Sequence, residues 1–163
     1  MEARELPQPQ PQAFELVLRI RHPSMDPGEI SRLLQVTAEH CFKAGEPRKS
    51  SQSVHAETYW LATLNPGAWP VQSSFPDHTA STGATETLGQ FGSTVLGRAL
   101  LACAQRFLRP HVEFLRRLKT EGGEVRLLVE VNTAVVDGFT LTPELGREIH
   151  SLGIPIDFEF TPA

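Results

Sequence analysis

The chain has 163 residues, of which 40% are hydrophobic and 21% charged, and its formal net charge at pH 7 is −4. These values are typical of one folded domain whose core needs no metal or disulfide, and they exclude a chain that is disordered throughout. The acidic balance disfavours nucleic acid as a partner, because nucleic-acid binders usually carry an excess of Lys and Arg.

The first residues are rich in Pro and Gln, which predicts a disordered tail at residues 1–12 and a single α+β domain at residues 13–163. No basic and apolar leader is visible, and no apolar run approaches the ~18 residues that a membrane helix needs. Cys41 and Cys103 lie outside any C-x-x-C pair. These features predict a cytoplasmic protein without membrane contact.

The first half of the domain is predicted to contain two strands and one helix. Apolar and polar side chains alternate over residues 13–21, which is typical of a strand with one buried face. An Asp-Pro pair at residues 26–27 starts a short helix that ends near Val36. Residues 37–57 show no periodic pattern and are predicted to be irregular, and residues 58–64 form the next strand.

The middle of the chain is predicted to be a long loop followed by a helical pair. Residues 65–85 are rich in Pro, Gly, Ser and Thr, and a loop of this length is either a functional lid or a tolerated insertion. Helical spacing of apolar residues follows over residues 86–108. Pro110 ends or kinks this helix, and a second helical segment runs on to Lys119.

The second half repeats the order of the first. Residues 124–131 alternate as a strand, a Thr-Pro pair at residues 142–143 starts a helix that closes at Gly153, and residues 154–160 form the last strand. Pro155 favours an edge position for that strand. The order predicts an α+β fold, a ferredoxin-like two-layer sandwich of duplicated β-α-β halves with the helical pair inserted between them.

No catalytic signature is present. The chain has no G-x-S-x-G, H-E-x-x-H, phosphate-binding or dinucleotide-binding motif, and its six histidines are scattered. His40 and Cys41 are adjacent, but neighbours in sequence rarely point at each other and no third group is identifiable. We therefore expect no catalytic residue, no metal ligand and no cofactor.

Two surfaces are candidates for binding. Lys43 and Arg48 lie in a turn-rich basic loop and, with Trp60 and Trp69, could line a cleft between the sheet and the loops at residues 37–57 and 65–85. The polar face of the sheet is either a docking surface or merely solvated. It is predicted to carry Arg19, Arg21, Arg126, Glu130, Asp157 and Glu159.

The order of several segments resembles a bacterial family catalogued only as domain of unknown function 4279. The resemblance lies in the opening strand with MDPGEISRLLQV, the KAGEPR turn, the YW strand, a helical pair broken at Leu108-Arg109-Pro110, and the closing LTPELGREIHSLGIPIDFEF. It covers about residues 14–160. The family name implies no activity, so the resemblance assigns no functional residue.

Three classes of function follow from these features. The first is a non-catalytic protein-binding domain, most concretely an immunity protein that neutralises a basic toxin, because the acidic charge would suit such a partner. Another is a homo-oligomeric structural module that pairs through an exposed strand edge. The alternative is a small-ligand-binding protein or an enzyme of unknown reaction that uses the cleft between sheet and loops.

Overall fold

The computed structural model describes residues 13–49, 53–64, 88–134, 136 and 139–162. The predicted disordered tail at residues 1–12 lies outside these residues. The predicted loop at residues 65–85, which contains Trp69, lies outside them as well.

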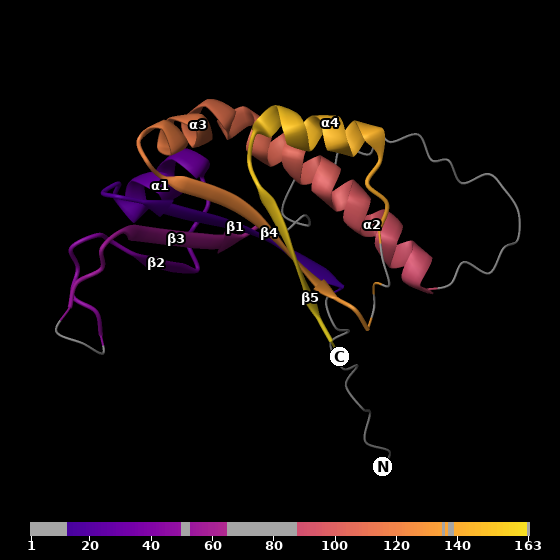
Figure 1. Cartoon of the computed structure of the whole chain (residues 1–163), viewed down its shortest axis with the longest axis horizontal. Coiled ribbons are helices and arrows are strands. Elements are labelled where there is room, and N and C mark those ends of the chain that lie inside the picture. The colour runs from indigo at the N-terminus through magenta and orange to yellow at the C-terminus, as the bar shows by residue number, and fades with distance from the viewer. Residues whose placement is uncertain (1–12, 50–52, 65–87, 135, 137–138, 163) are drawn as a thin grey trace, which may run out of the picture.

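The described residues form a mixed sheet of five strands in the order β2-β3-β1-β4-β5 (Figure 1). The central strand β1 pairs antiparallel with both β3 and β4, whereas β4 and β5 run parallel. β2 pairs antiparallel with β3 and forms one edge of the sheet. The strands are β1 (Phe14–His22), β2 (His40–Phe42), β3 (Thr58–Thr63), β4 (Glu124–Asn132) and β5 (Ile156–Thr161).

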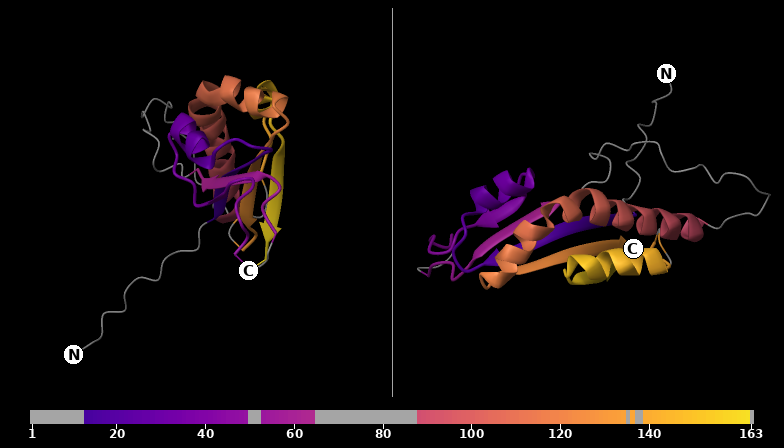
Figure 2. Two further views of the ribbon diagram at one scale, coloured as in Figure 1. Left: turned by 90° about the vertical axis from the view of Figure 1, so that its left-hand side faces the viewer. Right: turned by 90° about the horizontal axis from the view of Figure 1, so that it is seen from above.

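The described helices gather on one side of the sheet (Figure 2). α1 (Pro27–Leu34) starts at Asp26, whose carboxylate accepts a hydrogen bond of 2.8 Å from the backbone N–H of Gly28. α4 (Pro143–Leu152) starts at Thr142, whose hydroxyl accepts one from the N–H of Leu145 at 3.2 Å. Both starts follow the cap-plus-Pro prediction. The remaining helices are α2 (Leu88–Ala102) and α3 (Val112–Thr120).

A π-helical turn and a 3-10 turn join α2 to α3 without a loop. The π turn spans Cys103–Leu108 and the 3-10 turn spans Arg109–His111. Pro110 cannot donate a backbone hydrogen bond and its ring crowds the preceding turn, so a regular helix cannot pass through this point. The predicted break at Pro110 is therefore a change of helical pitch.

The core lies between the helices and one face of the sheet. Alternate residues of β1 and β4 point into the core, and apolar side chains of α2 and α3 pack against them from the helical layer. Each of the central residues is at most 1% exposed. They include Leu16, Leu18, Ile20, Leu96, Leu100, Leu115, Leu118, Leu127 and Val129.

The structure confirms the predicted α+β class, while the ferredoxin-like arrangement stays a prediction. The two halves pair differently, because β1 and β3 are antiparallel and β4 and β5 are parallel. The predicted duplication therefore does not extend to the sheet. The prediction of an irregular segment at residues 37–57 is wrong at β2, whose three residues are too few to show a period. None of the helices in the described part of the chain combines the length and apolar character that crossing a membrane requires.

Candidate functional site

The side of the sheet that faces away from the described helices is a charged surface, which we call the open face. Alternation along β1, β4 and β5 places all six residues of the predicted polar face on it, as the strand register shows. The residues brought together are Arg19, Arg21, Arg126, Glu130, Asp157 and Glu159.

One part of the open face is internally neutralised. Arg19 and Arg126 are direct partners across β1 and β4, and Asp157 on β5 lies 3.9 Å from the first guanidinium and 3.1 Å from the second. Glu124 also pairs with Arg126. Arg126 donates hydrogen bonds to the carboxylates of Glu124 and Asp157, and these bonds raise its pKa. Each arginine here therefore has a carboxylate partner, and this part of the face is balanced.

The adjoining part of the open face carries unbalanced negative charge. Glu15, Glu130 and Glu159 are aligned partners across β1, β4 and β5, and we call them the carboxylate row. Burial raises the pKa of Glu130, and repulsion from Glu15 and Glu159 raises it further. Within the described residues, no Lys, Arg or His forms an ion pair with any of the three.

A shallow cavity lies beside the carboxylate row. It has a volume of about 190 Å³ and is lined by the ends of β1, β4 and β5. Its carboxylates come from Glu15 and Glu130, and its floor also includes Phe14, Asn132, Thr161 and Pro162. The negative charge is thus presented in a concave part of the surface.

A larger cavity lies at the opposite edge of the sheet, and we call it the β2-edge cavity. Its volume is about 600 Å³. Three of its rings are stacked: Phe42 lies 3.8 Å from His55 and 5.2 Å from Tyr59 between ring centroids. The lining residues are His40, Cys41, Phe42, Arg48, Lys49, His55 and Tyr59.

The structure separates the residues that the sequence placed in one cleft. Arg48 lines the β2-edge cavity, but Lys43 is paired with Asp26 at 2.8 Å. Trp60 was predicted to line the cleft, and this is wrong: it is fully buried, and its indole N–H donates to the Ser31 hydroxyl at 2.8 Å. Trp60 shares the buried face of β3 with Thr58, whereas Tyr59 between them faces the cavity. Trp69 lies outside the described residues.

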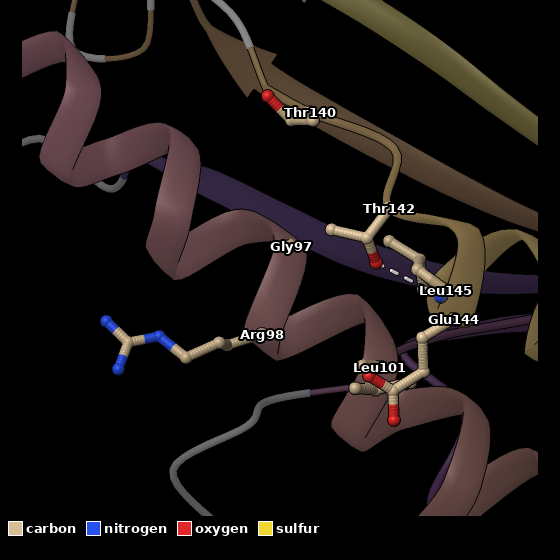
Figure 3. Close-up of a pocket in the computed structure, with 7 residues that line it drawn as sticks. All are labelled: Gly97, Arg98, Leu101, Thr140, Thr142, Glu144 and Leu145. Carbon is tan, nitrogen blue, oxygen red and sulfur yellow. Dashed lines mark hydrogen bonds between the residues drawn. The ribbon is translucent and has the colours of Figure 1, made fainter. Parts of the chain in front are cut away.

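A third cavity, of about 310 Å³, lies between α2 and the start of α4 (Figure 3). The Thr142 hydroxyl, a polar group in the lining that could contact a ligand, already accepts a hydrogen bond from Leu145 N–H and so caps α4. The Arg98 side chain points away from the other lining residues in Figure 3. The arrangement is that of a helix start packed against a neighbouring helix.

Sequence reasoning missed Glu15 and the aromatic lining of the β2-edge cavity. Glu15 belongs to the alternating pattern of β1, but its alignment with Glu130 depends on strand register. Phe42 lies on the short strand β2, which the sequence pattern did not indicate. In the described part of the chain, no group of three or more His, Cys, Asp or Glu side chains is placed to hold a metal ion.

Comparison with known proteins adds no relative to this picture. No family model matches the chain, and neither a curated protein nor a solved structure matches it significantly.

Proposed function

We propose that this chain is a non-catalytic binding protein whose open face docks on a positively charged protein surface. The observation that carries the proposal is the carboxylate row of Glu15, Glu130 and Glu159, which has no cationic partner within the described residues. Like charges directly opposite one another destabilise a sheet. A partner that supplies cations would relieve that repulsion when it binds.

The contrast within the open face supports this interpretation. Arg19 and Arg126 are matched by Asp157 and Glu124, so the same strands carry balanced charge a few residues away. If the open face were merely solvated, nothing would require its paired charges and its unpaired carboxylates to lie in separate parts of the face. Electrostatic complementarity of this kind steers association and selects partners more than it adds raw affinity.

The most concrete form of the proposal is an immunity protein that neutralises a basic toxin. The net charge of −4 and the concave acidic surface support a cationic target. The resemblance to domain of unknown function 4279 stays part of the proposal, and it assigns no partner. A second copy of this chain is the competing partner, because β2 and β5 both present strand edges.

Affinity capture with paired baits tests the proposal. Wild-type protein and the triple variant E15Q/E130Q/E159Q each serve as bait in a native lysate at low and at high salt. The captured proteins are then identified by mass spectrometry. We expect a stoichiometric basic protein on the wild-type bait, and its loss from the triple variant and at high salt, since salt screens exposed charges.

A second triple variant controls for net charge alone. E29Q/E113Q/E144Q removes the same number of negative charges from the helices, away from the open face. This bait should retain the basic partner. Equal capture by both triple variants, or capture of another copy of this chain alone, would rule out the proposed basic partner.

A further inference from the structure

The β2-edge cavity has a cationic wall in a chain that is acidic overall. Arg48 and Lys49 line it and are exposed, and within the described residues neither is within ion-pair distance of a carboxylate. Seven of the described residues line the cavity, and none of these seven is acidic. By contrast, Lys43 in the same loop is held by Asp26. The cavity therefore offers two uncommitted cations to an anion.

Aromatic rings line the same cavity. The rings of Phe42 and His55 are separated by 3.8 Å with an interplanar angle of 19°, and those of Phe42 and Tyr59 by 5.2 Å with an angle of 13°. Three nearly parallel rings form a stacked series whose outer rings, His55 and Tyr59, are partly exposed. A planar ligand ring can extend such a series by stacking.

The described residues of the loop that carries the cations, 43–49 and 53–57, pair with one another through backbone hydrogen bonds. Arg48 donates its N–H to the carbonyl of Ser53 at 3.0 Å, and His55 donates to the carbonyl of Glu46 at 2.9 Å. A bridge between Pro47 and Val54 continues this ladder. The loop therefore holds Arg48 and His55 on one ribbon, with the cation and the ring both directed to the same cavity.

We propose that the β2-edge cavity binds a small aromatic anion of the mononucleotide class. Its base stacks on the series formed by His55, Phe42 and Tyr59, and its phosphate is held by Arg48 and Lys49. The cavity volume of about 600 Å³ lies in the range of small-molecule sites. This site is at the β2 edge and the carboxylate row is on the β5 side of the sheet, so the inference is independent of the proposed protein partner.

Calorimetry with adenosine monophosphate as the probe tests both halves of the site. Adenosine supplies the ring without the charge, and inorganic phosphate supplies the charge without the ring. We expect the nucleotide to bind at least about tenfold more tightly than either half, because adenosine lacks the charge-assisted hydrogen bonds and inorganic phosphate lacks the stacking.

Two variants locate the site. R48Q/K49Q should weaken nucleotide binding by roughly tenfold or more and leave adenosine binding unchanged, whereas H55A should weaken both. R32Q removes an exposed cation from α1 and should change neither. Arg48 and Lys49 are exposed, so their replacement leaves the core intact.

The cysteines provide a second readout. Cys41 is exposed and lines the cavity, whereas Cys103 is buried and burial raises its pKa to about 12. Bound nucleotide should slow alkylation of Cys41, and Cys103 should stay unmodified in the folded protein.

Three results would overturn the inference: no binding of the probe at about 1 mM, binding unaffected by R48Q/K49Q, or affinity that grows steadily with the length of a single-stranded oligonucleotide.

Discussion

Gly123, between α3 and β4, has no room for a side chain. A Cβ atom there would lie 2.8 Å from Cδ2 of His22 and 2.8 Å from the carbonyl oxygen of Leu118. The His22 ring is held in place because its Nδ1 accepts the backbone N–H groups of Ser24 at 3.2 Å and Met25 at 2.9 Å. We therefore predict that G123A lowers the free energy of unfolding by about 1–3 kcal/mol in urea titrations.

Gly146 provides the matched control for that substitution. It lies inside α4, and a Cβ atom there would meet nothing within 4 Å. G146A should therefore raise the free energy of unfolding by up to about 1 kcal/mol, because alanine favours a helix interior over glycine. A G123A protein as stable as wild type would contradict the close packing described at His22.

Glu130 stands between two like charges and should lower the stability of the isolated chain. Its aligned neighbours are Glu15 and Glu159, and its pKa is raised by burial and by both of them. We predict that E130Q raises the free energy of unfolding at pH 7 by about 0.5–1 kcal/mol. E113Q removes a carboxylate that pairs with Arg116 and should bring no such gain.

The raised pKa of Glu130 also fixes how the stability gain of E130Q should change with pH. The pKa of Glu130 in the folded state lies above its ordinary value of 4.5, so the repulsion is fully present well above the folded pKa and disappears as protonation proceeds. The stability difference between E130Q and wild type should shrink as the pH falls from 7 toward 4.5. A difference that grows over this range would contradict the account.

At the scale of elements, one ion pair links the start of α1 to the loop after β2. The carboxylate of Asp26 accepts from Lys43 Nζ at 2.8 Å and from the backbone N–H of Gly28 at 2.8 Å. Both contacts lower its pKa, that of Lys43 more strongly. The two contacts of Asp26 therefore stabilise the folded protein fully at a pH above 3.8, the ordinary pKa of this carboxyl group. This stabilisation is lost as the pH falls through the lower pKa of Asp26 in the folded state.

Three variants separate the cap from the ion pair. D26N keeps a capping oxygen and removes the charge, so we expect its melting temperature to lie between those of wild type and D26A. K43Q should lose no more than D26N, because it keeps the charged cap at Asp26, and D26N/K43Q should add no further loss to that of D26N. In about 1 M salt the difference between D26N and wild type should narrow. An undiminished difference there would mean that the charge is not its cause.

At the scale of the whole molecule, alternation along the strands was enough to predict most of the open face. The pattern in β1, β4 and β5 puts Arg19, Arg126 and Asp157 on one side, because period 2 is a local property. The carboxylate row was not predictable in the same way. It depends on strand order and register, which follow from packing over the whole sheet.

The candidate ligand site shows a second limit of local patterns. Trp60 and Tyr59 are neighbours of similar character, yet burial takes Trp60 into the core and leaves Tyr59 facing the β2-edge cavity. The three residues of β2 carry no period, and their structure comes from pairing with β3. The Phe42 ring therefore stacks on Tyr59 because β2 pairs with β3, and the sequence pattern of β2 alone does not indicate this pairing.

The proposed function is the binding of a cationic protein by the open face through the carboxylate row. Its most direct test is the dissociation constant of the purified basic partner for wild type, E15Q/E130Q/E159Q and E29Q/E113Q/E144Q. We predict that the first triple variant binds at least about thirtyfold more weakly and the second within about threefold of wild type. Equal affinities of the two triple variants for the partner would contradict the claim.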